Sequence, residues 1–338
     1  MVNISKNLNY KIKFCDLNYN SGFFNMQDLR KKINKKTIAV VLTNMFNTYQ
    51  DTILLRKICR KKGVILIEDN AIFFDNYKKI KNKKNFSGTF GNYSLYSFNI
   101  MKNISALYGG GISTNDKDFI NFAQNEIKLF KSFNLFLLFK QSIIYIILKL
   151  LSVRLFYKLF FFKIVKQAHL NNNLFLLKIF YPSLKFTNSK FPNYYFTKIS
   201  NFSKKLVYLQ LQDIVSRNNN HKLRKTKNNY YMNKFKKKKI KHVQLLPIKD
   251  FNFQNFIDFP IIVKDKINLN KFLLKNGIET RTIYYRNCSK IFKTKNSFCT
   301  KAEKYENEII CLPNHTKINN KYIDYIIQII SKFYDRRY

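Results

Sequence analysis

Hydrophobic and polar positions in the first third of the chain alternate as they do in an α/β domain. An extended stretch, YKIKFCDL at 10–17, precedes a helical pattern, NMQDLRKKI at 25–33. Two apolar runs, TIAVVL at 37–42 and VILIED at 64–69, have the length and β-branched content of buried strands. A second helical pattern at 51–62 separates these runs. Strand, helix, strand predicts a mostly parallel sheet flanked by helices, with the two runs as central strands.

The pattern continues into the stretch GNYSLYSFN at 91–99, which we expect to be a further strand. Three of the eight glycines then stand together at 109–111, before the strand-like ISTND. So many glycines in one place indicate unusual backbone angles or the close approach of a ligand or another strand. Ligands of parallel sheets gather beyond the carboxyl ends of strands, where Glu68 and Asp69 stand. From the pattern alone, Asp69 is equally well interpreted as the cap of a turn or helix.

Residues 133–165, here called the apolar segment, read FNLFLLFKQSIIYIILKLLSVRLFYKLFFFKIV. A central Lys or Arg opposes membrane insertion by roughly 2.5–3.5 kcal/mol, and no uncharged window approaches the ~20 residues of a span. A transmembrane helix is therefore not expected. Two interpretations stay open: helices with cationic edges that lie in a bilayer interface, or helices buried against another subunit. Five basic residues interrupt the segment: Lys140, Lys149, Arg154, Lys158 and Lys163.

The overall charge is strongly positive, with 62 Lys+Arg against 19 Asp+Glu and a formal net charge of +43. Such a balance suits nucleic acid or an anionic membrane surface. The basic residues are nevertheless spread along the chain, and Lys, Asn, Ile and Phe are all abundant, which is typical of a genome-wide compositional bias. No RNP, zinc-finger or helix-turn-helix pattern accompanies the charge, so a nucleic-acid partner is not expected.

Cysteine and histidine patterns favour neither a disulfide framework nor a metal site. The number of cysteines is odd, no CxxC pair occurs, and the four histidines are far apart without HExxH-type spacing. The opening MVNISKNLNYKIKF lacks the apolar region and cleavage site of a secretory leader. A cytoplasmic protein is expected, with membrane association through the apolar segment left open. The cysteines are Cys15, Cys59, Cys288, Cys299 and Cys311.

The central motifs follow one another in a characteristic order, since IEDNA at 67–71 is followed by GTFGNYSLYSFNIMKNISALYGGGISTND at 88–116. An Asp-bearing strand thus precedes a Ser-Phe, a lysine five residues past that serine, and a Gly-Gly segment leading to Thr-Asn-Asp. This order resembles the DegT/StrS family of pyridoxal-phosphate-dependent sugar aminotransferases. The resemblance extends to 14–46, to SNFSKKLVYLQLQDIVSR at 200–217, and to the C-terminal stretches 259–281 and 308–330.

The resemblance implies an aminotransferase fold of type I, with a large cofactor-binding domain and a smaller C-terminal α+β domain. It places the large domain at 1–130, an apolar helical insertion at 131–190 and the small domain at 191–338. It also implies a homodimer whose active sites lie at the interface between subunits.

By the same resemblance, Lys102 would hold pyridoxal 5′-phosphate as a Schiff base, and Asp69 would keep the pyridine nitrogen protonated so that the ring accepts electrons. Ser97 would bond the cofactor phosphate. Dehydratases in the family carry histidine where Lys102 stands, so the lysine favours amino transfer. A solvated Lys102 and an ordinary strand-end Ser97 are the alternatives. Arg281 in GIETR reaches an anionic substrate group or is a solvated arginine, with both interpretations open.

Some family features are replaced. Ile72 stands where members commonly have Gln or His near the cofactor's phenolic oxygen, and Phe196, Thr197 and Lys198 stand where many have Asn-Tyr-Arg. Members usually carry an earlier segment with a Gly-Thr turn and a stacking aromatic, which the few residues before Phe14 do not provide. Two expectations stay open for this difference: a truncated start or a reduced member of the family. Phosphate binding is therefore expected to rest on Ser97 and on basic residues nearby.

The implied substrates are a nucleotide-diphosphate-linked 3-keto or 4-keto sugar and an amino donor such as glutamate, for surface polysaccharide or glycoconjugate synthesis. The excess of positive charge suits a diphosphate. Two rival functions come from other classes: a noncatalytic descendant that keeps the fold without the cofactor, and a basic nucleic-acid-binding protein.

Overall fold

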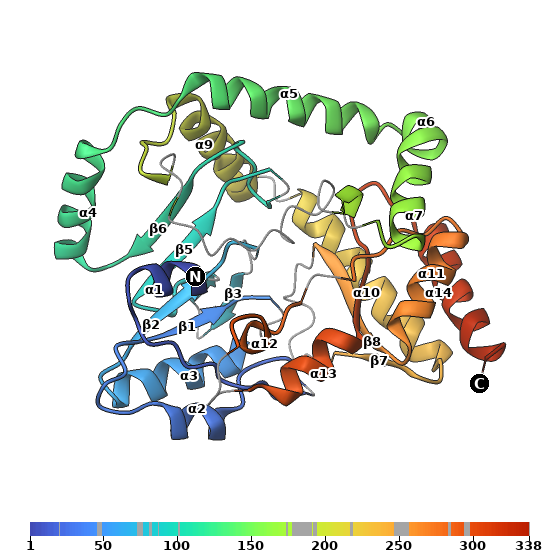
Figure 1. Ribbon diagram of the computed structural model, residues 1–338, viewed down its shortest axis with the longest axis horizontal. Coiled ribbons are helices and arrows are strands. Elements are labelled where there is room, and N and C mark those ends of the chain that lie inside the picture. The colour runs from blue at the N-terminus through green and yellow to red at the C-terminus, as the bar shows by residue number, and fades with distance from the viewer. Residues whose placement is uncertain are drawn as a thin grey trace.

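The computed structural model describes residues 1–19, 21–45, 49–72, 77–80, 83–86, 88–100, 102–173, 175–177, 191, 195–216, 219–246, 257–282, 285–293 and 298–337. The two larger of three sheets organise these residues, one built from the first third of the chain and one from the last third, and helices surround both (Figure 1).

The N-terminal sheet has the strand order β1-β2-β5-β6. Strands β1, β2 and β5 run parallel, and β6 pairs with β5 in the antiparallel direction. The three parallel strands therefore present their carboxyl ends at one edge, where Thr43 lies beside Asp69 and Asp69 beside Leu95. The predicted fold class and strands are confirmed. The bounds are Ala39–Thr43, Ile65–Asp69, Tyr93–Ser97 and Gly110–Thr114.

Helices cover this sheet because their buried side chains and those of the strands pack into one core. Leu29 on α2, Leu55 on α3 and Leu42 and Leu66 on the strands are all nearly or fully buried in that core. Two strands, β3 (Tyr77–Ile80) and β4 (Lys83–Phe86), form a separate antiparallel pair. The helix bounds are Val2–Asn7 for α1, Met26–Lys32 for α2 and Tyr49–Lys61 for α3.

The extended stretch at 10–17 forms no regular strand; its only sheet-like contact among the described residues is the bridge between Leu17 and Phe24. Side chains bind its backbone instead: the Asp16 N–H donates to Asp28 Oδ2 at 2.8 Å, and Lys32 Nζ donates to the Phe14 carbonyl at 2.7 Å. The stretch predicted to be extended therefore lies outside the sheet, and side chains of α2 satisfy part of its backbone.

The C-terminal sheet is antiparallel in the order β7-β8-β9 and carries the larger core. Phe259, Ile261, Ile326 and Ile330 have no exposed surface. Helix α14 covers this sheet together with α10 and α11 (Figure 1). The strands are Val243–Leu245, Asp258–Val263 and Ile309–Pro313; the helices are Asn219–Lys238 (α10), Lys266–Lys275 (α11), Cys288–Ile291 (α12), Thr300–Glu308 (α13) and Asn320–Asp335 (α14).

Helix α9 (Asn201–Ser216) follows the predicted domain boundary near 191, yet it contacts the loop before β6, since Ser203 Oγ donates to the Ala106 carbonyl at 2.7 Å. The division at 130 and 190 stays a prediction.

The apolar segment joins the two sheets as a chain of helices along the outer edge of the molecule (Figure 1). Helix α5 buries none of its residues, whereas α7 buries Val165, Ala168 and His169. Among the described residues, no helix is both long and apolar enough to cross a bilayer. The bounds are Lys117–Leu129 for α4, which precedes the segment, then Leu135–Leu151 (α5), Arg154–Phe156 (α6), the π-helical turn Tyr157–Phe161 (η1) and Phe162–Leu170 (α7).

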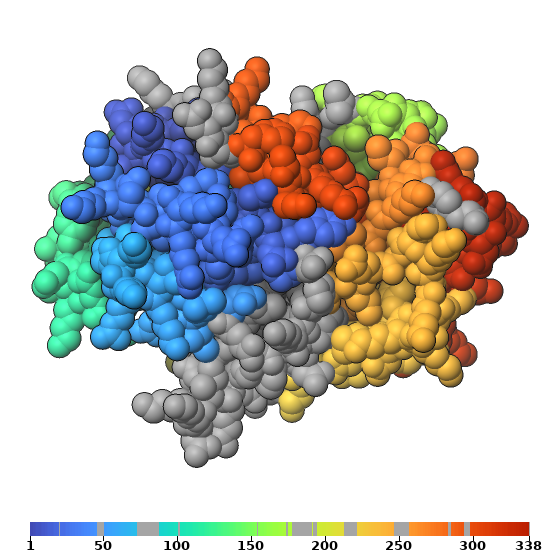
Figure 2. Space-filling view, turned by 90° about the horizontal axis from the view of Figure 1, so that it is seen from below, coloured from blue at the N-terminus to red at the C-terminus, as the bar shows by residue number. Residues whose placement is uncertain are grey.

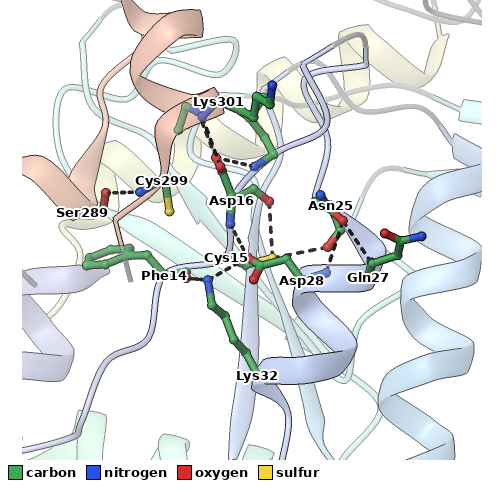
Figure 3. Close-up of polar contacts among 12 residues, drawn as sticks. Phe14, Cys15, Asp16, Asn25, Gln27, Asp28, Lys32, Ser289, Cys299 and Lys301 are labelled. Carbon is green, nitrogen blue, oxygen red and sulfur yellow. Dashed lines mark hydrogen bonds and ion pairs between the residues drawn. The ribbon is translucent and has the colours of Figure 1, made fainter. Parts of the chain in front are cut away.

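The two ends of the fold meet where the N-terminal segment lies beside α13, seen in Figure 2 as blue beside orange. Helix α13 has no capping bond from its own N-cap residue, Cys299. Asp16 supplies the cap from the other end of the chain: its carboxylate accepts the N–H groups of Lys301 at 3.1 Å and Ala302 at 2.9 Å (Figure 3). A carboxylate at this position also complements the positive end of the helix dipole.

Candidate active site

Lys102 lies in the loop between β5 and β6, and its side chain is half-buried. Burial lowers the pKa of Lys102, since it disfavours the charged amine; Asp69 acts against that shift, and the positive charge of Arg281 adds to it. Asp69 and Arg281 are therefore charged neighbours of the amine. Lys102 and Asp69 belong to the same end of the N-terminal sheet, since Lys102 follows β5 and Asp69 ends β2. Arg281 lies beside β9 of the C-terminal sheet, where its backbone bonds Cys311.

Asp69 ends β2, and its carboxylate has a local bond as well: Oδ1 accepts the Ala71 N–H at 3.1 Å. The turn-capping interpretation from the sequence therefore holds for one oxygen. The backbone on both sides is fixed by the neighbouring strands, because the Asp69 carbonyl accepts the Asn44 N–H at 2.9 Å and the Asn70 N–H donates to the Leu95 carbonyl at 2.8 Å. Asp69 is thus held by rigid elements rather than by a free loop.

A small pocket lies between the ends of β2 and β5. Ser97 lines it with a hydroxyl group, and Ile72, Phe98 and Ile104 give it apolar walls. Ile72 thus faces the pocket at the position where a polar residue was expected from the family. The remaining lining residues are Asn70, Ala71, Tyr96 and Asn103.

Glu68, next to Asp69, has a different role because neighbouring residues of a strand point to opposite faces. It is 1% exposed, and its carboxylate accepts the N–H groups of Phe90 at 2.7 Å, Gly91 at 2.6 Å and Gly88 at 3.2 Å, with the Asn44 amide at 3.2 Å. Such donors offset the cost of burying a charge. Glu68 therefore fixes the turn that leads into β5, and it does not face the pocket.

The loop that carries Lys102 is held from two helices. Asn103 Nδ2 donates to the Ile72 carbonyl at 3.2 Å, and Arg224 of α10 donates to Asn103 Oδ1 at 2.8 Å. Gln210 of α9 accepts the Ser105 N–H at 3.0 Å and donates to the Ser105 carbonyl at 2.9 Å. We call these bonds the loop clamp. Sequence reasoning missed it, although Gln210 belongs to the Gln-Leu helix that carried part of the resemblance.

Arg281 is partly exposed, and its guanidinium forms an ion pair with Asp258 Oδ2 at 3.1 Å. Its backbone bonds both the N–H and the carbonyl of Cys311. Burial raises the pKa of Asp258, while Arg281 and Arg224 act in the opposite direction. Arg281 is therefore a fixed cation near Lys102.

The residues at 196–198 lie at the end of α4. Phe196 packs edge-on against Phe130 with ring centroids 6.0 Å apart, and the Lys198 N–H donates to the Lys131 carbonyl at 2.8 Å. Phe196, Thr197 and Lys198 are not among the residues that line the pocket.

Comparison with known proteins gives one family match that spans most of the chain. The model of the DegT/DnrJ/EryC1/StrS aminotransferase family matches residues 1–133 and 187–331. It leaves 134–186 unmatched, which includes nearly all of the apolar segment.

Curated relatives match over shorter stretches. GDP-perosamine synthase of Vibrio cholerae is 34% identical over 105 residues, which is 30% of this chain and 27% of that protein. The UDP-4-amino-4,6-dideoxy-N-acetyl-beta-L-altrosamine transaminase of Helicobacter pylori is 28% identical over 113 residues, which is 33% of this chain and 28% of that protein. The matched stretches span little more than a quarter of these relatives.

Solved structures share the fold over almost the whole chain. The putative sugar aminotransferase Spr1654 from Streptococcus pneumoniae, in its PLP form, superposes with a TM-score of 0.67 at 14% identity, covering 99% of this chain and 78% of that one. PseC of Helicobacter pylori, an aminotransferase of pseudaminic acid biosynthesis, gives 0.65 at 17% identity, covering 99% and 76%. At such identity the likeness establishes the fold.

Proposed function

The chain belongs to the DegT/DnrJ/EryC1/StrS aminotransferase family, and on that premise we propose that it is a pyridoxal-phosphate-dependent aminotransferase that converts a nucleotide-linked keto-sugar to an amino-sugar. The observation that carries the proposal is the half-buried amine of Lys102, whose pKa burial lowers, within reach of Asp69 at the edge where Ser97 lines a pocket. A solvated surface lysine requires none of these features.

The residues present fit the cofactor. Lys102 offers the amine that would hold it covalently, and Asp69 offers the carboxylate that would pair with a protonated ring nitrogen. Ser97 offers a hydroxyl for the phosphate, and Ile72, Phe98 and Ile104 offer apolar walls for a flat ring. When bound, the cofactor would supply an electron sink for proton removal beside a nitrogen.

The chain's own residues prepare Lys102 for this role. Because burial lowers its pKa, a larger fraction of the Nζ is neutral at a given pH than in a solvated lysine, and the neutral amine is both the nucleophile and the proton acceptor. The loop clamp fixes the backbone on the C-terminal side of Lys102, so the amine is positioned by bonds to Asn103 and Ser105.

We propose Arg281 as the contact for an anionic group of the substrate. Its ion pair with Asp258 holds the guanidinium in place, which favours recognition of a carboxylate or phosphate by a preorganised cation. The matched relatives act on GDP- and UDP-linked sugars by their names. A nucleotide-diphosphate keto-sugar, with glutamate as amino donor, is therefore the proposed substrate pair, for surface polysaccharide or glycoconjugate synthesis by a homodimer.

The test mixes purified protein with pyridoxal phosphate, reduces it with borohydride and maps the labelled peptide. The label is expected on Lys102. Lys102→Ala should lose it, while the matched control Lys117→Ala, which removes an exposed lysine at the start of α4, should keep it. Asp69→Asn should retain the label but slow amino transfer at least a hundredfold, because a neutral amide does not stabilise a protonated ring nitrogen.

Label spread over surface lysines, and unchanged in Lys102→Ala, would overturn the assignment. Wild-type protein that is folded yet takes no label would favour the noncatalytic alternative.

A further inference from the structure

The outward side of α5 is an apolar stripe without a partner among the described residues. Phe139, Ile143, Ile146 and Leu150 recur every three to four residues, so they lie along one side of the helix, and each is exposed. Phe139 is 63% exposed and Ile146 is 55% exposed. The opposite side of the helix faces the protein, where Gln141 donates to Asn99 Oδ1 at 3.3 Å.

Apolar side chains are also exposed in the turns that follow α5 in the chain, namely Val153, Leu155, Phe156, Leu159, Phe160 and Ile164. Single exposed apolar residues are ordinary on a protein surface, but so many along one segment mark a surface that binds a partner or a membrane.

The charge around the stripe is of one sign. Four lysines, Lys140, Lys149, Lys158 and Lys163, are exposed along the segment. No acidic residue occurs anywhere between Glu126 and Asp213. Lysine stems lie along apolar surface while their amines reach the polar side, so these residues suit the boundary between hydrocarbon and anionic headgroups.

From these observations we infer that the apolar segment docks the protein on an anionic membrane surface, lying in the interface without crossing the bilayer. A second copy of this chain fits less well. A two-fold contact places the same patch against itself, which would bring the lysines of one copy toward those of the other with no carboxylate in the segment to pair with them.

Two further features agree. The family model leaves 134–186 unmatched, so the stripe is not part of the matched aminotransferase fold. Asn99, which α5 contacts, follows Ser97 by two residues, so docking would turn the edge of the sheet that carries the pocket toward the membrane. The inference does not rest on the proposed chemistry.

The chain contains no tryptophan, so one introduced tryptophan reports on one position. Phe139→Trp in the full chain should shift its emission to the blue when mixed with vesicles of phosphatidylglycerol and phosphatidylcholine at low salt, and bromine-labelled lipid should quench it. Phe298→Trp, at a residue that is also about half exposed but lies away from the stripe, is the control and should not change. High salt should weaken the binding, because screening shortens the reach of the lysines.

Two matched pairs of variants separate the apolar and the charged contributions. In the Phe139→Trp protein, Ile143→Asp with Ile146→Asp should weaken vesicle binding at least tenfold, whereas Ile267→Asp, at an exposed isoleucine of α11, should not. Lys140→Glu with Lys149→Glu should also weaken it at least tenfold, whereas Lys236→Glu with Lys237→Glu in the last turn of α10 should leave it within twofold.

The inference is overturned if folded Phe139→Trp protein shows no change with anionic vesicles at low salt. It is also overturned if the tryptophan emission is blue-shifted without lipid and the shift grows with the dimer fraction measured by sedimentation velocity. A second copy would then cover the stripe. If a variant in the stripe and its control variant lose vesicle binding equally, the stripe is not the cause of binding.

Discussion

Helices α5 and α14 are similar in length, and α5 is the more apolar of the two, but the protein buries α14 and leaves α5 exposed. Helix α14 has 16 residues and buries eight of them, whereas α5 has 17 and buries none. After its first residue, the exposed positions of α14 recur every three or four residues on one side, and they are Lys321, Tyr325, Gln328, Lys332 and Asp335. In α5 the exposed side is the apolar one. Apolar content alone therefore does not place a helix on the core; the arrangement of polar residues does.

The sharpest way to break this comparison is to place a carboxylate on each helix. Ile326→Asp puts a charge into a site with no exposed surface, and the loss of more than about 4 kcal/mol should leave little folded protein. Ile146→Asp, at a residue 55% exposed, should change the unfolding free energy in solution by less than about 0.5 kcal/mol. Urea unfolding followed by circular dichroism measures both. Similar losses would mean that α5 is packed in solution.

A smaller change removes methyl groups instead of adding charge. Ile330→Ala should cost about 2–5 kcal/mol because it leaves a cavity beside β8 and β9 in the core. Ile143→Ala in α5 leaves no cavity, and its cost in solution should stay within about 0.5 kcal/mol. The same urea titration compares the two, and a loss above 1 kcal/mol in α5 would contradict the comparison.

The N-terminal caps of α5 and α14 give a finer test of the same comparison. Asn319 Oδ1 accepts the Tyr322 N–H at 2.9 Å at the start of α14, and Asn134 Oδ1 accepts the Phe136 N–H at 2.8 Å at the start of α5. Asn319→Ala should lower global stability by about 1 kcal/mol. Asn134→Ala should leave the global midpoint nearly unchanged and instead raise hydrogen exchange in the first turn of α5, because that helix opens separately from the core. Equal shifts of the midpoint would show that α5 unfolds with the core.

The smallest effect compares two lysines. Burial lowers the pKa of Lys102, so the folded protein releases this proton at a lower pH than the unfolded chain does. Wild-type stability therefore gains as pH rises from the folded pKa of Lys102 toward the ordinary lysine value near 10.4, and below this window the buried charge opposes folding.

Lys102→Met should lose that gain, while Lys149→Met on exposed α5 should keep it. Unfolding midpoints at pH values from 8 to 10 measure the difference from wild type. Buried cysteines and tyrosines with raised pKa values act in the opposite direction, but they are common to all three proteins. Parallel curves for wild type and Lys102→Met would contradict the assigned environment.

The N-terminal sheet was predictable because a buried parallel strand is a short apolar run, which can be recognised without knowing its neighbours in the fold. The run at 64–69 became β2, and the run at 37–42 became β1 with a shift of one to two residues. Lys102, Asp69 and Ser97 could be proposed as one candidate site from the family motifs, because the strands that carry or precede them end at the same edge of the sheet.

The loop clamp was not predictable. Arg224 and Asn103 are 121 residues apart, and asparagine is so frequent in this chain that Asn103 does not stand out. Glu68 illustrates a second limit: the sequence placed it where chemistry occurs, and only the strand direction showed that its carboxylate binds backbone amides on the other side. The cap that Asp16 gives to α13 likewise joins residues that no local pattern connects.

That cap has a consequence for the order of events on the ribosome. Asp16 and Lys301 are 285 residues apart, so at about 5–20 residues per second roughly 15–60 s pass between the synthesis of the cap and that of the helix it caps. Throughout that interval the N-terminal sheet can form, but the Asp16 carboxylate can bind only water and residues near it in sequence. The junction between the two ends is therefore completed late in biosynthesis, and chains that terminate before α13 leave Asp16 without the amides that it holds in the finished protein.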